Sequence, residues 1–231
     1  MDAFSRLNLY YPTASLDIGS KTVKRILFIT GTDTGIGKTF LAVRLMKQLR
    51  ASGINAAGLK PICSGGRSDA KQAYDAMNGA LSLDEINPWH FKAAIAPLLA
   101  ARQERKKIRL SQVVSHVRAM QKRFDVMVVE GAGGLLSPLG ENFDSRDLIA
   151  VLRAVPVIVA PNRLGVVNHI LLTLEALPKN LRAKAFVILM PQRKPDTAAK
   201  TNTKLLGEFF APKRILVASD SKLVSRILGA F

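Results

Sequence analysis

The segment Ile26-Leu-Phe-Ile-Thr-Gly31-Thr-Asp-Thr-Gly-Ile-Gly37-Lys38-Thr39 decides the fold of this 231-residue chain. An apolar run typical of a buried strand leads into a glycine-rich loop. Where the loop ends, Leu41, Leu45 and Leu49 begin the apolar stripe of an amphipathic helix. Glycines let the backbone approach an anion, and a helix N-terminus adds positive potential. The order of strand, loop and helix therefore predicts a phosphate-binding loop.

The residues that close this loop have a specific chemistry. Lys38 can reach the β- and γ-phosphates of a nucleotide, and the Thr39 hydroxyl can bind Mg²⁺. Five residues separate Gly31 from Gly37, one more than in the common form of the loop. A glycine-rich turn that merely begins a helix would not need a Lys-Thr pair directly after its last glycine.

Strands and helices alternate along the rest of the sequence. Continuous apolar runs of strand length recur at 26–30, 55–60, 126–130, 156–160, 186–190 and 215–218. Helical patterns cover 38–51, where Gly53 gives a stop signal, 111–123, which begins with a capping-type serine, and 167–177. We expect an α/β fold, a single P-loop domain over residues 21–231 with a mainly parallel sheet and helices on both faces, preceded by an extension over residues 1–20.

Composition excludes several classes of protein. Apolar residues make up 48% of the chain, which is too many for a disordered protein. Cys63 is the single cysteine, so neither an intramolecular disulfide nor a multi-cysteine metal centre can form. No stretch approaches the roughly 20 apolar residues of a membrane span, and no signal peptide is evident. We expect a cytoplasmic protein without a membrane partner.

The formal net charge of +17 needs a separate explanation. One basic cluster lies at 102–109 and another spans residues 179–231. Such an excess suits either a polyanion partner or a solvated face that aids solubility. Because neither cluster is interleaved with aromatic residues, we favour the solvated face and expect no nucleic-acid partner.

Further motifs follow the loop, and together with it they resemble the dethiobiotin synthetase family. They are Gly58-Leu-Lys60-Pro61-Ile-Cys-Ser64-Gly65, Ser68-Asp69, Asn87-Pro88-Trp-His-Phe91, Val129-Glu130-Gly131-Ala132-Gly133-Gly134 with Pro138-Leu139, and Leu164-Gly165-Val166-Val167-Asn168-His169. The loop itself has the longer form found in that family. The motifs lie in the family's order and cover about residues 25 to 175.

The resemblance implies a ligase of biotin biosynthesis that uses ATP and Mg²⁺. Its substrates would be 7,8-diaminononanoate and CO₂ or bicarbonate. One amine forms a carbamate, the carbamate takes the γ-phosphoryl group as a carbamic–phosphoric anhydride, and the second amine closes a cyclic urea. Phosphoryl transfer of this kind needs charge neutralisation and placement more than covalent help. The resemblance also implies a homodimer with the substrate site at its interface.

The resemblance assigns roles to residues by motif. Catalysis would use Lys60, Lys38, Thr34 and Ser64, and the metal ligands would be Thr39, Asp69 and Glu130. Nucleotide contacts would come from Gly35, Ile36, Gly37, Lys38, Thr39, Phe40, Glu130 and Gly133. Substrate contacts would come from Thr34, Lys60, Ser64, Gly131 and Gly134, and from Gly165, Val166, Val167 and Asn168 across the dimer.

The residues alone leave simpler readings open. Lys60 could be an ordinary strand-end lysine, and Asp69 could simply start a helix over 70–77. Glu130 ends an apolar strand, where a carboxylate is costly unless it meets a cation, so it could be a metal ligand or a salt-bridged group. The Gly165–Asn168 segment could be a plain helix start.

The segments 187–192 and 214–219 depart from the family pattern at the base-binding end of the nucleotide site. The base preference therefore stays open, with Gln192 as a residue that could read adenine. Two other functions stay open: a ParA/MinD-like switch ATPase that binds DNA or membrane, and a family member that has lost turnover.

Overall fold

The computed structural model describes residues 24–229 of the chain, so the predicted extension over 1–20 lies outside the described residues. Within that range six parallel strands form the main sheet in the order β2-β5-β1-β6-β7-β8. These strands are β1 (Arg25–Gly31), β2 (Ala56–Leu59), β5 (Val126–Glu130), β6 (Val155–Pro161), β7 (Phe186–Met190) and β8 (Ile215–Val217). Each overlaps an apolar run named above, which confirms the predicted α/β fold.

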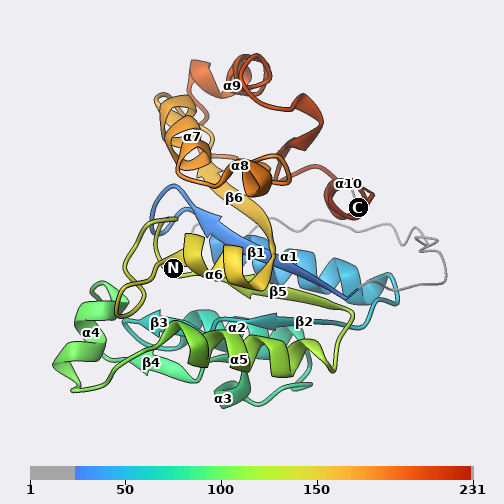
Figure 1. Ribbon diagram of the computed structural model, residues 1–231. Helices are drawn as coiled ribbons and strands as arrows, with labels where there is room; N and C mark the ends of the chain where they lie inside the picture. The colour runs from blue at the N-terminus through green and yellow to red at the C-terminus, as the bar shows by residue number, and fades with distance from the viewer. Residues whose placement is uncertain (1–23, 230–231) are drawn as a thin grey trace.

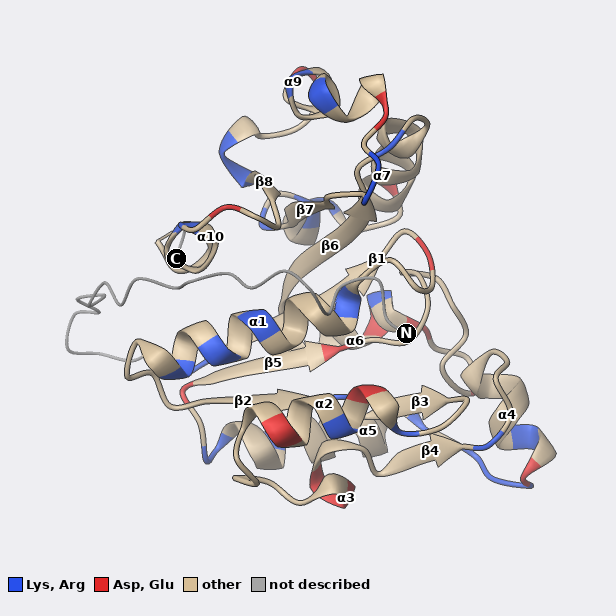
Figure 2. Cartoon of the chain, turned by 180° about the vertical axis from the view of Figure 1, so that it is seen from behind, with Lys and Arg blue, Asp and Glu red and all other residues tan. Residues whose placement is uncertain are grey.

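Helices cover both faces of this sheet (Figures 1 and 2). On one face lie α1 (Lys38–Ala51), α2 (Ser68–Ala76) and α10 (Leu223–Leu228). On the other lie α5 (Leu110–Gln121), α6 (Ser145–Leu152) and α7 (Val166–Glu175). The remaining helical segments are short: α3 (Leu83–Ile86), α4 (Pro97–Gln103), α8 (Lys179–Arg182), α9 (Asn202–Leu206), η1 (Thr197–Lys200) and η2 (Pro212–Arg214).

A second, two-stranded parallel sheet lies beside β2. It pairs β3 (Ile62–Ser64) with β4 (Trp89–Phe91), and Cys63 is the register partner of His90. Lys60 and Pro61 form the short link between β2 and β3. The chain therefore leaves the main sheet at Lys60 and enters the small sheet within two residues.

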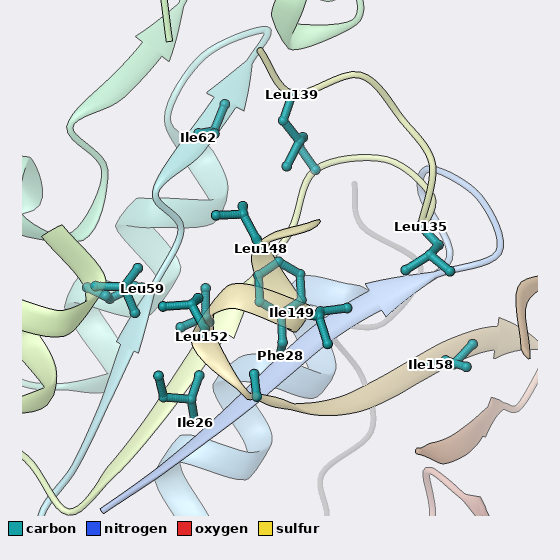
Figure 3. Packing of buried hydrophobic residues seen from close by; sticks show 14 of the residues in the cluster. Ile26, Phe28, Leu59, Ile62, Leu135, Leu139, Leu148, Ile149, Leu152 and Ile158 are labelled. Carbon is teal, nitrogen blue, oxygen red and sulfur yellow. The ribbon is translucent and has the colours of Figure 1, made fainter. Parts of the chain in front are cut away.

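Both faces of β1 are buried, which explains its continuous apolar run. Ile26 and Phe28 point to one hydrophobic cluster, and Leu27 and Ile29 point to the other. Figure 3 shows Phe28 beside α6, whose Leu148, Ile149 and Leu152 share its cluster. This rigid centre holds the strand ends, including the loop that follows β1.

Two details differ from the sequence expectations. The helix expected over 111–123 begins at Leu110, and Arg109 rather than Ser111 stands at its N-cap, so Ser111 lies inside the helix. The small β3–β4 sheet was not expected, because three-residue strands carry too little periodicity to be read from sequence.

Candidate functional site

Most of the functional residues predicted from the phosphate loop, the Lys60 motif, the Ser68-Asp69 motif and the Glu130 motif converge on one cavity at the ends of β1, β2 and β5. Its volume is about 610 Å³. Its lining comprises Thr34, Gly35, Gly37, Lys38, Thr39, Phe40, Lys60, Cys63, Ser64, Asp69, Gln72, Glu130, Ala132 and Gly133. Parallel strands end at this edge, so side chains that follow separate strands come together here.

The loop after β1 has the backbone that anion binding needs. Gly37 is the N-cap of α1 with φ of 97°, and a Cβ there would lie 2.7 Å from Cε of Met190. Gly35 also has a positive φ, of 67°. No side chain caps α1, and no acidic residue lies in its first turn. The N-terminal N–H groups of this 14-residue helix are therefore left for an anion.

Lys38 is held inside the loop that precedes it. Its Nζ donates to the backbone carbonyl of Asp33 at 2.6 Å, and the residue is 6% exposed. Burial lowers the pKa of Lys38 to about 8, and the nearby charge of Lys60 acts in the same direction. A bound polyphosphate would supply the anionic partner that this ammonium group lacks in the loop.

Lys60, Glu130 and Asp69 form a buried ionic cluster. Nζ of Lys60 lies 2.7 Å from Oε1 of Glu130 and 3.2 Å from Oδ2 of Asp69, and it donates to the carbonyl of Gly131 at 3.0 Å. Burial opposes the charge on Lys60, but Glu130 and Asp69 outweigh it and raise the pKa of Lys60. Lys60 is therefore no ordinary surface lysine, and the cation that Glu130 meets among the described residues is this ammonium group.

The oxygen atoms near the loop suit a small divalent cation. Thr39 Oγ1 donates to Glu130 Oε1 at 2.8 Å, and Asp69 lines the same cavity with 38% of its side chain exposed. No cluster of three or more His, Cys, Asp or Glu side chains with metal-binding spacing occurs within residues 24–229. Mg²⁺ usually takes one or two carboxylates and completes its shell with water and phosphate oxygens, so this donor set fits it.

The other predicted contact residues divide into two groups. Thr34 and Ser64 line the cavity, and Ser64 Oγ donates to the carbonyl of Ile95 at 2.6 Å. Ile36, Gly131 and Gly134 do not line it. Gly131 contributes through its carbonyl, as described above, and the N–H of Gly134 is taken by Ser137 Oγ at 2.9 Å. Ile36, Gly131 and Gly134 therefore have no surface on the cavity through which to contact a ligand directly.

The predicted substrate segment at Gly165–Asn168 is separate from the cavity. Gly165 is the N-cap of α7 with φ of 84°, and no side chain caps this helix. None of Gly165, Val166, Val167 and Asn168 lines the cavity. Within one copy of the chain this segment contributes nothing to the site.

Sequence reasoning missed two lining residues and undervalued a third. Gln72 lies one helical turn after Asp69 on α2, a spacing that places both on one side of that helix. Ala132 lies inside the glycine motif after β5. Cys63 was expected to fill space in the Lys60 turn; it is 4% exposed and also lines the cavity, and burial raises the pKa of its thiol.

Gln192 does not line the cavity either. Its side-chain amide donates to the carbonyl of Met190 at 3.2 Å, at the end of β7. The described cavity therefore contains the three predicted metal ligands and most of the predicted nucleotide contacts, but not the residue considered for reading the base.

Relatives of the chain carry the name of one enzyme. A protein of Anaeromyxobacter dehalogenans (strain 2CP-C), named ATP-dependent dethiobiotin synthetase BioD, is 44% identical over 169 residues, covering 71% of this chain and 76% of its own. A protein of the same name from Methanocaldococcus jannaschii is 36% identical over 168 residues, covering 71% and 78%. The chain belongs to the dethiobiotin synthetase family. The predicted family and its ATP-dependent ligase function are thereby confirmed.

A family model described as an AAA domain matches residues 25–224 of this dethiobiotin synthetase family member. Among solved structures, a pNOB8 ParA bound to nonspecific DNA covers 89% of this chain and 96% of its own, with a TM-score of 0.55 and 14% identity. A chain of the MinC:MinD cell division protein complex of Aquifex aeolicus covers 88% of this chain and 85% of its own, with a TM-score of 0.52 and 13% identity. At such identities the likeness shows the P-loop fold alone, and it does not favour a switch-ATPase function.

Proposed function

We propose that the cavity binds Mg²⁺–ATP and 7,8-diaminononanoate and closes a cyclic urea with CO₂. The observation that carries the proposal is the convergence of Lys38, Lys60 and Glu130 on one cavity at the N-terminus of α1. Two ammonium groups beside a phosphate-binding loop suit a reaction in which negative charge gathers around a terminal phosphoryl group.

The loop would bind the nucleotide phosphates. The N–H groups at the start of α1 would donate to phosphate oxygens, with Gly35, Gly37, Thr39 and Phe40 along the wall. Lys38 would exchange the Asp33 carbonyl for the β- and γ-phosphates. Burial lowers the pKa of Lys38 in the free protein. The negative charge of the phosphates would stabilise its ammonium group and raise that pKa again.

The chemistry would run in three balanced steps. An amine of the substrate attacks CO₂ and loses a proton, which gives a carbamate. A carbamate oxygen attacks the γ-phosphorus as the bond to ADP breaks. The second amine then attacks the carbamate carbon and loses a proton, inorganic phosphate leaves, and the ring closes. Lys60 would hold the carbamate and the transferring group, while Thr34 and Ser64 would orient the amines.

Thr39, Asp69 and Glu130 would hold Mg²⁺, which would neutralise charge on the nucleotide phosphates when bound. Glu130 would then have two roles, because its carboxylate also raises the pKa of the buried Lys60 in the wall of the cavity. Gly133 would lie close to the nucleotide, at the tight turn after β5.

The substrate carboxylate would bind outside the cavity of one chain. The exposed start of α7 at Gly165–Asn168 supplies a helix N-terminus that suits an anion. Because this segment does not line the cavity of its own chain, we infer a homodimer in which a second copy provides it. No helix within residues 24–229 is long and apolar enough to cross a bilayer. From the proposed biosynthetic reaction, we infer a cytoplasmic enzyme.

A test measures phosphate release by the purified chain with diaminononanoate, bicarbonate, Mg²⁺ and ATP. We expect release that depends on the diamine, together with a product that has the mass of dethiobiotin. Tight nucleotide binding without any diamine-dependent release would instead identify a family member that has lost turnover. Release stimulated by DNA and indifferent to the diamine would contradict the proposal.

A further inference from the structure

Asn87 is a completely buried polar residue with no role in the account above. It is 0% exposed and stands between α3 and β4, in the Asn87-Pro88 motif. Burying a side-chain amide is costly unless its donors and acceptor find partners. Its partners therefore indicate what the residue is for.

The amide nitrogen of Asn87 holds the backbone at Lys60. Nδ2 donates to the carbonyl of Lys60 at 2.7 Å, and the N–H of Lys60 donates to the carbonyl of Ile86 at 3.0 Å. Lys60 follows the last residue of β2 and lies outside both sheets. Ile86 and Asn87 thus pair with the backbone of Lys60 as a neighbouring strand would do inside a sheet.

The amide oxygen of Asn87 holds the start of α2. Oδ1 accepts from Nε of Arg67 at 3.2 Å and from Sγ of Cys63 at 3.2 Å, and the backbone carbonyl of Asn87 accepts from Nη2 of Arg67 at 3.1 Å. Arg67 is the N-cap residue of α2 and stands two residues before Asp69. One buried amide therefore anchors the segments that carry both Lys60 and Asp69.

We propose that Asn87 is a positioning residue that fixes the backbone segments from which Lys60 and Asp69 meet in the wall of the cavity. The proposal rests on the function proposed above. Lys60 has to hold an anion whose position is fixed by the loop after β1, and Asn87 fixes the backbone from which its side chain reaches. Displacement of a catalytic group by about 1 Å can cost about 100-fold in rate.

The sharpest variant is Asn87→Asp, which keeps the shape of the side chain. It replaces the donor at the Lys60 carbonyl by an oxygen, so that contact becomes repulsive, while the acceptor for Arg67 remains. Asn55→Asp is the matched control. Asn55 stands at the other end of β2, where its Nδ2 donates to the exposed carbonyl of Arg123 at 3.0 Å.

Two measurements separate positioning from general destabilisation. We expect Asn87→Asp to lower kcat by about 10- to 100-fold while the KM for ATP stays within about twofold, because the loop after β1 is untouched. The chain has a single cysteine, so the labelling rate of Cys63 by an aromatic disulfide reports on the anchor directly. We expect faster labelling in Asn87→Asp and wild-type values for both measurements in Asn55→Asp.

Asn87→Ala carries the same expectations without a new charge, in case Asn87→Asp does not fold. A folded Asn87 variant with wild-type kcat overturns the proposal. A parallel loss of kcat, ATP affinity and thermal midpoint also overturns it, because that pattern marks a structural role only. If the wild type itself shows no diamine-dependent turnover, the proposed function fails; an unchanged Cys63 labelling rate in the Asn87 variants then overturns the anchor independently.

Discussion

The N-termini of α1 and α7 have nearly the same local structure and very different surroundings. Each follows a glycine with positive φ, 97° at Gly37 and 84° at Gly165. Neither has a side-chain cap or an acidic residue in its first turn. Both therefore present a helix N-terminus that suits an anion, although the first N–H of α7, at Val166, donates to the carbonyl of Arg163 at 3.2 Å.

The surroundings decide what each terminus can do. At α1 the walls carry Lys38, Lys60 and Glu130, all of them less than 10% exposed. At α7 the neighbouring Leu164 is 74% exposed, and no residue of the segment lines the cavity. Buried charge around the helix N-terminus therefore distinguishes the reaction site proposed at α1 from the carboxylate-binding site proposed at α7.

Removing an ammonium group near α1 should give the largest effect on activity. We expect Lys60→Met and Lys38→Met each to lower kcat by about 10³-fold or more, because preorganised charge at the phosphoryl group is lost. Lys47→Met, on the exposed side of the same helix, serves as the control. Steady-state phosphate release measures the effect, and near wild-type rates in either site variant would refute its assigned role.

The free energy of unfolding should depend on the buried charges near α1. Glu130→Gln leaves Lys60 buried with Asp69 as its remaining ionic partner, and we expect the free energy of unfolding to fall by about 2–3 kcal/mol. Urea unfolding measures this change. Glu141→Gln removes the partner of an exposed Arg102 pair and should leave the transition midpoint unmoved. Equal midpoints for the two variants would contradict the account.

The lowered pKa of Lys38 makes nucleotide affinity depend on pH. With a pKa of about 8 the free protein has a charged Lys38 at pH 7 and a neutral one at pH 9. Binding at pH 9 must then include proton uptake, so ATP affinity should fall about tenfold between these values. Calorimetric titration measures it. Lys38→Arg, whose side chain stays charged, should show a flatter profile, and equal slopes would remove Lys38 as the cause.

A pair of glycine substitutions compares the two helix N-termini directly and has the smallest expected effect. Gly37→Ala and Gly165→Ala both force an L-residue into positive φ, at about 1–2 kcal/mol each. A Cβ at Gly37 also meets Met190, whereas nothing lies within 4 Å of one at Gly165. We expect Gly37→Ala to weaken ATP binding several-fold and Gly165→Ala to leave it unchanged. Equal ATP affinities in the two variants would show that the loop tolerates the contact.

The α1 side could be read from sequence because its signals are local. The helix at Lys38–Ala51 was predicted with its observed bounds, and the cavity contains five residues of the loop and three of the Glu130 motif. The rest depends on contacts between distant segments. Gln72 enters the cavity because α2 packs beside α1, and Asn87 meets Lys60 because the β3–β4 sheet brings residues 27 positions apart together. The apolar periodicity of the sequence does not predict such contacts between distant segments.

In the proposed reaction, Lys38 and Lys60 meet the same phosphoryl group. The most direct measurement is a crystal structure of the chain with Mg²⁺, a non-hydrolysable ATP analogue and diaminononanoate. We expect the terminal phosphate within hydrogen-bonding distance of both Nζ atoms, and the Thr39 and Glu130 oxygens facing the metal. A terminal phosphate bound by Lys38 alone, with Lys60 still closed onto Glu130 and Asp69 and distant from both ligands, would contradict the account.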